Sequence, residues 1–106
     1  MKVRAVWGIQ DVLDGAADWT VELGDCLEVL RLMPDACVDS VVTDPPAGIE
    51  FMGKGWDSFG GDARTSFIGS ITQVMQECLR VLKPGGHALV WALPRTSHWT
   101  ATAIED

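Results

Sequence analysis

A carboxylate followed by two prolines, Asp44-Pro45-Pro46, is the part of this sequence with the clearest capacity for chemistry. It follows Val41 and Val42, whose β-branched side chains favour a buried strand. Proline cannot continue a strand ladder, and the residue before a proline is restricted to an extended backbone. Asp44 is therefore expected at the carboxyl end of a strand, where ligands bind in open α/β sheets. Its carboxylate and the Pro45 carbonyl would offer two acceptors, which suit an amino group with two N–H donors.

Four ordered segments surround or contain this tripeptide and carry a family resemblance: LGDCLEVL (23–30), DPPAGI (44–49), FMGKGWD (51–57), and CLRVLKPGG (78–86), which leads into HALVW (87–91). In this order they resemble the N-terminal part of S-adenosylmethionine-dependent DNA amino-methyltransferases of the permuted class. In that class the catalytic loop precedes the cofactor loop. The resemblance extends from about Val21 to Asp106, and the order of the segments is more specific than Asp-Pro-Pro alone.

The resemblance implies methyl transfer from S-adenosyl-L-methionine to the exocyclic amino group of a base in DNA, with adenine N6 preferred over cytosine N4. Asp44 in place of serine favours adenine by analogy with the family. The target base would be flipped out of the duplex to reach the site. Asp44 and the Pro45 carbonyl, with Pro46 completing the turn, would accept both amino protons. These bonds favour the pyramidal nitrogen and the positive charge that develops on it. A restriction-modification role is the setting that the family implies.

The position after the second proline departs from the family, because Ala47 stands where an aromatic ring usually stacks on the flipped base. Loss of one such stack costs about 1–3 kcal/mol. Trp56, in the glycine-rich loop that follows, is one candidate for the missing ring, and otherwise it anchors that loop. Phe51 either lines the target pocket or holds the loop in place. The expected substrate-binding residues are thus Ala47, Phe51 and Trp56.

The cofactor is expected near Asp25 and Cys26. In the related fold an acidic residue at the end of the first strand approaches the adenine end of the cofactor, and the Cys26 backbone N–H would lie beside it. Asp25 is also a suitable N-cap for the following helix, and both roles are compatible. In the permuted class the Phe-x-Gly-x-Gly loop that holds the methionine part of the cofactor lies far downstream of the catalytic loop. The FMGKG run at 51–55 instead follows the Asp-Pro-Pro turn directly, and no second run of this pattern follows it in this sequence.

The elements needed to position these residues alternate between strand and helix. We expect strands at 20–24, 38–43 and 88–93, and helices at about 26–33, 65–83 and 97–104, with a weakly structured segment at 1–19 and a loop at 47–64. Alternation of this kind predicts a parallel sheet with right-handed crossovers. The predicted fold is α/β: a partial Rossmann-like class I methyltransferase sheet, mostly parallel, with flanking helices, forming one partial domain over residues 1–106.

Composition limits the class of protein. The chain has 106 residues, 47% hydrophobic residues and a net charge of −7. An acidic chain is poorly suited to the DNA backbone, so we expect the basic target-recognition surface to lie elsewhere.

The three cysteines lack metal-ligand spacing, which favours free thiols, no metal site and a cytoplasmic location. No apolar run is long enough for a membrane span. Exposed sheet edges would be covered in a homodimer.

Two other readings of the sequence stay open. One is a non-catalytic binding module, or a remnant, on a methyltransferase fold. This alternative is favoured by Ala47, the acidic charge and the missing cofactor loop. The other is an RNA or protein-amide methyltransferase, in which a related Pro-Pro clamp usually begins with asparagine. In the preferred reading the chain is a fragment of a DNA methyltransferase, lacking the cofactor loop and the target-recognition region and inactive by itself.

Overall fold

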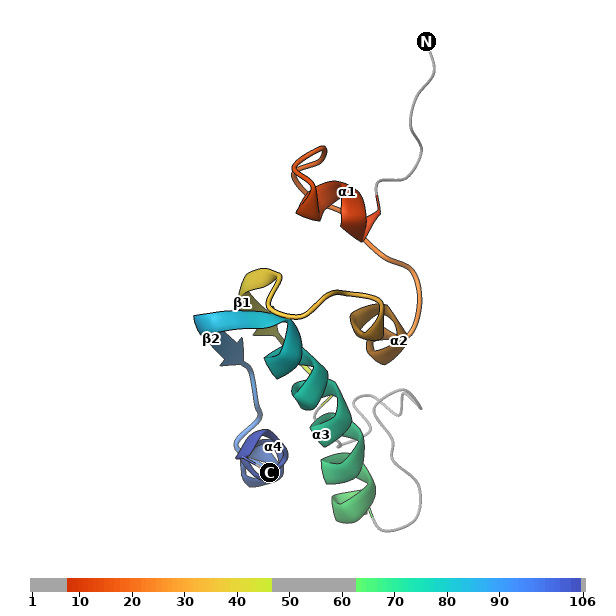
Figure 1. Cartoon of the computed structure of the whole chain (residues 1–106). Helices are drawn as coiled ribbons and strands as arrows, with labels where there is room; N and C mark the ends of the chain where they lie inside the picture. The colour runs from red at the N-terminus through yellow and green to blue at the C-terminus, as the bar shows by residue number, and fades with distance from the viewer. Residues whose placement is uncertain (1–7, 47–62, 106) are drawn as a thin grey trace.

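The computed structural model describes residues 8–46 and 63–105. Two strands and four helices are present in these ranges (Figure 1): α1 (Ile9–Leu13), α2 (Cys26–Arg31), β1 (Val38–Thr43), α3 (Ala63–Val81), β2 (Leu82–Val90) and α4 (Ser97–Glu105). The strand predicted at 38–43 and the helix predicted from Ser97 are confirmed. The α/β class is also confirmed, in the form of a small parallel sheet with flanking helices.

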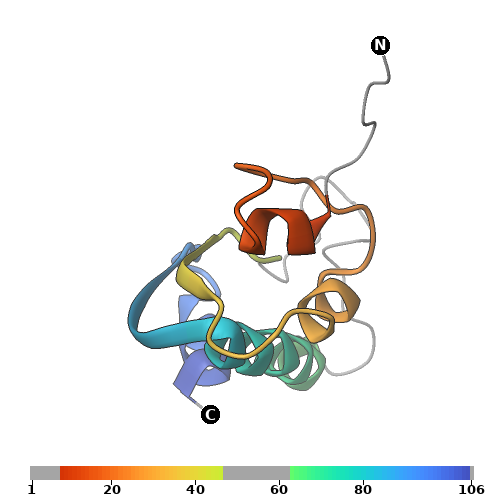
Figure 2. The same cartoon turned by 45° about the horizontal axis from the view of Figure 1, so that its top comes forward.

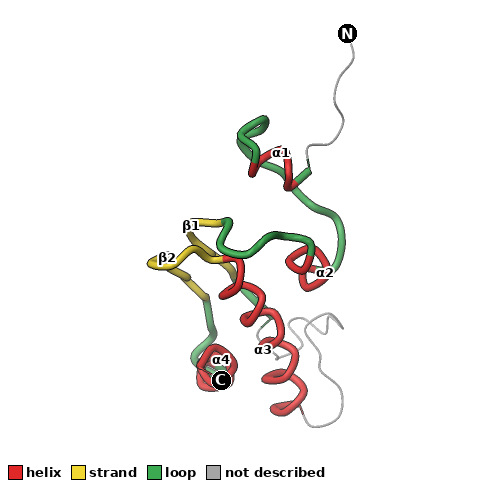
Figure 3. Tube along the Cα trace, in the orientation of Figure 1, coloured by secondary structure: helices red, strands yellow, loops and turns green. Residues whose placement is uncertain are grey.

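The two strands pair in parallel, and α3 forms the connection between them (Figure 3). Val41, Val42 and Thr43 lie opposite Ala88, Leu89 and Val90, respectively. Parallel strands require such a crossover because both must run in the same direction. Their carboxyl ends therefore meet at one edge, and Asp44 follows β1 directly at that edge.

Helices α3 and α4 lie on the same side of the sheet (Figures 1 and 3). The buried core sits between them and consists of Phe67, Ile71 and Ala103, with Ile68, Met75 and Trp99 packed against it. The rings of Phe67 and Trp99 have centroids 5.9 Å apart and are tilted by 51°. The 3.6-residue spacing of apolar side chains along α3 explains this packing.

The opposite face of the sheet is open in the described structure. Val42 is 76% exposed and Leu89 is 69% exposed, although both belong to paired strands. Helix α1 lies apart from the two strands in Figure 1, whereas in the turned view of Figure 2 it overlaps the end of β1 in projection. Side chains alternate between the two faces of a strand, so Val41 and Val90 face the helices while Val42 and Leu89 face outward.

The strand predicted at 20–24 was wrong. Residues 20–23 form no strand, and Leu23 is fully exposed. A strand needs a neighbour for its backbone N–H and C=O groups, and in the described ranges only β1 and β2 pair. Alternating apolar residues were not sufficient by themselves to form a strand at 20–24. The sheet therefore has two strands in the described residues, where the sequence predicted three.

The segment Pro84-Gly85-Gly86 directly follows the helix predicted at 65–83, but in the structure it lies within a strand. Helix α3 ends earlier, at Val81, and β2 begins at Leu82 and ends at Val90, three residues before the predicted end. The register shifts between Val38 and Ser40, which lie opposite Leu82 and His87, so Pro84-Gly85-Gly86 forms an irregularity within β2. Gly85 has a φ of +84°, which a residue with a side chain rarely adopts. The glycines thus allow β2 to bulge and still pair with β1.

Candidate active site at the carboxyl end of the sheet

Asp44 stands where the sequence predicted it, immediately after the last residue of β1. Its side chain is exposed, while Pro45 and Pro46 are half-buried. The prolines end the strand because they lack the N–H that a ladder needs. A carboxylate on a restricted backbone is therefore presented to solvent at the sheet edge where α/β proteins bind ligands. Such a group can accept hydrogen bonds from an amine.

Trp91 is brought to the same edge. Its backbone N–H donates to the carbonyl of Thr43 at 2.9 Å, which extends the pairing of the two strands by one further bond. The indole is 71% exposed. Trp99 packs on the core, but Trp91 is not buried, because β2 ends at Val90 and the outer sheet face has no covering element in the described residues.

Asp25 and Cys26 lie at the start of α2, and both are exposed. The Asp25 Oδ1 atom accepts from the backbone N–H groups of Leu27 at 2.9 Å and Glu28 at 3.4 Å. The predicted N-cap is therefore confirmed. Asp25 does not end a strand of the sheet, in contrast to the expectation that it follows the first strand. Its role toward a cofactor stays a prediction.

The three residues predicted to bind the substrate, Ala47, Phe51 and Trp56, lie outside the described residues. So does most of the loop predicted at 47–64, although α3 begins at Ala63, within that range. The described part of the site is thus the end of β1, with Asp44, Pro45 and Pro46, and the neighbouring end of β2. Sequence reasoning missed Trp91 as a member of this edge, because that required the register of the two strands.

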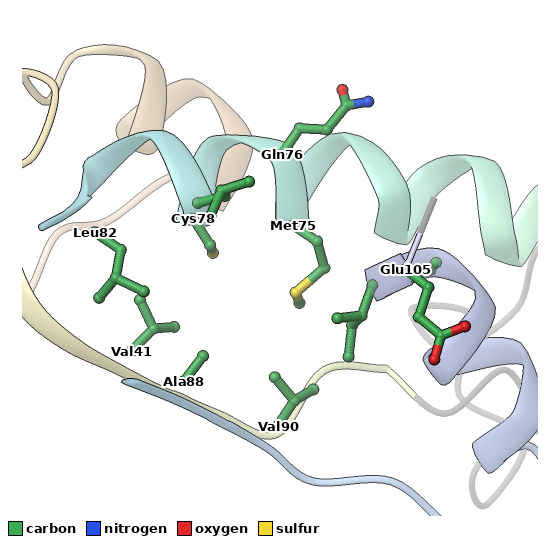
Figure 4. A pocket seen from close by; sticks show the side chains of 11 residues that line it. Val41, Met75, Gln76, Cys78, Leu82, Ala88, Val90 and Glu105 are labelled. Atoms are coloured by element: carbon green, nitrogen blue, oxygen red, sulfur yellow. The ribbon is translucent and has the colours of Figure 1, made fainter. Parts of the chain in front are cut away.

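A cavity of about 250 Å³ lies between the sheet and the helices α3 and α4 (Figure 4). Val41, Ala88 and Val90 of the sheet face Met75 and Cys78 of α3 across it. Burial raises the pKa of the Cys78 thiol, and Cys26 and Glu77 add to the effect through their charges. None of Asp25, Cys26, Asp44, Pro45 and Pro46 lines this cavity. It is an apolar space between two layers, on the other side of the sheet from the outward-facing residues.

Among the described residues, no cluster of three or more His, Cys, Asp or Glu side chains is arranged to hold a metal ion. No helix in residues 8–46 or 63–105 has the length and apolarity needed to cross a membrane.

Comparison with known proteins agrees with the family resemblance. The type II methyltransferase M.BamHI of Bacillus amyloliquefaciens is 37% identical over 75 residues, which are 68% of this chain and 17% of that protein. The type II methyltransferase M.BglII of Bacillus subtilis is 36% identical over 70 residues, or 64% of this chain and 17% of the relative. The matches thus span about one sixth of the length of the curated relatives. No protein-family model matches the chain, and no solved structure matches it significantly. The resemblance predicted from the sequence is confirmed: the chain is related to the type II DNA methyltransferases.

Proposed function

We propose that this chain carries the amine-binding part of a DNA methyltransferase that uses S-adenosyl-L-methionine to methylate an exocyclic amino group of a base. The observation that carries the proposal is the position of Asp44, exposed at the carboxyl end of a parallel strand and followed by two prolines. The similarity to type II methyltransferases supports this reading. Restriction-modification is the biological setting suggested by the names of those relatives.

The proposed chemistry follows from the electronic structure of an aromatic amine. Its nitrogen lone pair is delocalised into the ring, and it must be localised on nitrogen before that atom can attack a methyl group. The Asp44 carboxylate would accept one N–H and the Pro45 carbonyl the other, which favours the pyramidal nitrogen and stabilises its growing positive charge. Asp44 need not be a strong base, because the proton leaves after nitrogen has become positively charged.

The cofactor would supply an electrophilic methyl group bonded to a sulfonium centre. Asp25 fits a role in binding its adenine end, because Oδ1 caps α2 while Oδ2 makes no hydrogen bond among the described residues. One oxygen is thus left to accept from an adenine amino group. The exposed backbone turn at Cys26 would lie beside it. The rest of the cofactor would be held by groups other than these two.

Because the chain is expected to be inactive without the cofactor loop, the test is made in a longer protein that contains it. We would measure transfer of a tritiated methyl group from S-adenosylmethionine to unmethylated DNA, followed by nuclease digestion and chromatography of the nucleosides. We expect label in N6-methyladenine, and label in N4-methylcytosine would show the other amino-methyltransferase class. Asp44→Ala should lower the rate at least about 100-fold, in line with the loss of a group that stabilises transition-state charge. Asp44→Asn would keep an acceptor oxygen without the charge, so a smaller loss is expected.

Asp39→Asn is a matched control, because Asp39 is an exposed carboxylate in the same strand, distant from the carboxyl edge, and pairs with Lys83 at 3.0 Å. It should leave the rate unchanged. Equal rates for Asp44→Ala and the unsubstituted protein would contradict the proposal. DNA binding without methyl transfer would instead favour the non-catalytic module. Label in RNA or in a glutamine amide, when these are offered as acceptors in place of DNA, would favour the other enzyme classes. Sedimentation of the protein would show whether the open sheet face is covered in a homodimer.

A further inference from the structure

We infer that Trp91 supplies the aromatic surface on which the target base stacks while Asp44 binds the amino group of that base. This inference rests on the proposed function and deepens it, because it names a residue that would recognise the base. The ligand class is a planar heteroaromatic ring with an exocyclic amine.

The first support is the register of the two strands. Thr43 pairs with Val90, and the Trp91 N–H donates to the Thr43 carbonyl at 2.9 Å. One further step along both strands sets Asp44 beside Trp91. Neighbouring strands are about 4.7–4.9 Å apart, so the two residues leave the sheet as direct neighbours.

The second support is the face of the sheet on which the residues lie. Val42 pairs with Leu89, and both are exposed on the outer face, away from α3 and α4. Alternation along a strand returns to the same face after two residues. Asp44 is two residues beyond Val42, and Trp91 is two residues beyond Leu89, so the alternation directs both toward the outer face.

The third support is exposure. The Trp91 side chain is 71% exposed, whereas Trp99 of α4 lies against Phe67 in the core. The exposed indole ring of Trp91 provides a flat apolar surface beside an exposed carboxylate, and stacking on a base would bury that surface. Tryptophan stacks on any base because every base has a π face, so the indole would give affinity while the carboxylate selects bases with an amino group.

This arrangement also accounts for Ala47. The family resemblance implies a ring directly after the second proline, and this chain has alanine there. A ring supplied from the end of β2 reaches the same edge from the neighbouring strand. The stacking function would thus have moved from the strand that bears Asp44 to its partner strand.

The first test observes the indole N–H signals of the protein by NMR, with each of the five tryptophans assigned by its Trp→Phe variant. Deoxyadenosine and deoxycytidine are added separately, and thymidine, which has no exocyclic amine, is the comparison ligand. We expect the Trp91 signal to shift with the first two nucleosides and much less with thymidine. Trp19 is also 71% exposed but lies before α2, so its signal serves as the control and should stay in place. An unchanged Trp91 signal, or an equal shift with thymidine, would overturn the inference.

The second test separates this inference from the proposed function. In the methyl-transfer assay, Trp91→Ala should raise the KM for DNA about 5- to 150-fold, the range expected for one lost base stack. Trp91→Phe, which keeps a ring, should recover most of that loss, and Trp19→Ala should have no effect. If Asp44→Ala abolishes transfer while Trp91→Ala leaves KM and kcat unchanged, the inference is wrong and the proposed function stands. If the unsubstituted protein transfers no methyl group, the proposed function fails, and the nucleoside titration still decides whether bases stack on Trp91.

Discussion

The guanidinium of Arg80, near the end of α3, lies 2.7 Å from the carboxylate of Asp35, which is 45 residues earlier in the chain. The same guanidinium donates to the carbonyls of Leu30 and Met33, at 2.7 and 2.8 Å, and to Glu77 at 2.8 Å. One side chain therefore joins the end of α2 and the turn before β1 to α3. The backbone strengthens this junction, because the Ala36 N–H donates to the Arg80 carbonyl at 2.9 Å. The start of β1, and hence the position of Asp44 at its end, depends on this contact.

Arg80→Lys should lower the midpoint of thermal unfolding by several degrees. Lysine keeps the charge, but its single ammonium group cannot replace the planar fork that serves four acceptors. Hydrogen bonds to Asp35 and Glu77 raise the pKa of Arg80, so the arginine stays charged throughout the accessible pH range. Circular dichroism at 222 nm would measure the shift. Arg31→Lys on the exposed side of α2 is the control, and an equal effect of both substitutions would contradict a specific role for Arg80.

Gly86→Ala should destabilise the pairing of β1 with β2. A Cβ atom at position 86 would lie 2.7 Å from Leu82 Cδ1 and 2.8 Å from the Asp39 carbonyl oxygen, and the carbonyl belongs to the paired strand. Overpacking of this kind costs about 1–3 kcal/mol in the free energy of unfolding. Gly69→Ala is a contrasting variant, because the added Cβ meets nothing within 4 Å and position 69 lies in α3. It should raise stability by about 0.5–1 kcal/mol, and urea denaturation of both variants would show the opposite signs.

Phe67→Ala should detach α4 from α3. Phe67 is fully buried, and its ring lies 5.9 Å from that of Trp99. Loss of a buried phenylalanine side chain costs about 3–5 kcal/mol, which is a large part of the stability of a small domain. Hydrogen exchange of the α4 amides should accelerate more than that of the β1 amides. Trp99→Phe keeps an aromatic contact and should have a smaller effect, so equal acceleration in both variants would contradict the proposed packing role.

The Cys78 thiol should make stability depend on pH in the alkaline range. Burial raises its pKa above the ordinary value of 9.0, and Cys26 and Glu77 raise it further. Well below pH 9 the thiol is neutral in both states, so its contribution to stability is fully present. As the pH rises, the thiol of the unfolded chain ionises first, and that contribution is lost as the pH passes through the raised pKa of the folded state.

Urea midpoints of the unsubstituted protein and of Cys78→Ala, measured between pH 7.5 and 10.5, would test this. The difference between them should be constant up to about pH 9 and should then shrink. Cys26→Ala is the control for general effects of thiol ionisation, since Cys26 is exposed. A difference that does not change with pH would show that Cys78 ionises equally easily in both states.

Local features of the chain were predictable because their causes are local. Proline geometry and β-branched residues determine that β1 ends before Asp44, and the spacing of apolar residues determines most of α3. The features that the sequence did not predict had nonlocal causes. Leu79 of α3 lines the cavity between that helix and the sheet, yet it is 73% exposed, because the filling of that space depends on the sheet and α4 and not on the helix alone. The segment at 20–24 alternates like a strand but has no partner.

The sequence by itself determined the family, the Asp44-Pro45-Pro46 turn and the alternation of strands and helices, since each depends on residue types at close spacing. Only the tertiary structure decided that the Trp91 N–H donates to the carbonyl of Thr43, next to Asp44, and that Arg80 binds the turn before β1. Asp44 and Trp91 are separated by 47 positions, and Arg80 and Asp35 by 45. Contacts at such separations follow from strand register and helix docking, which many side chains set together and which no short motif encodes.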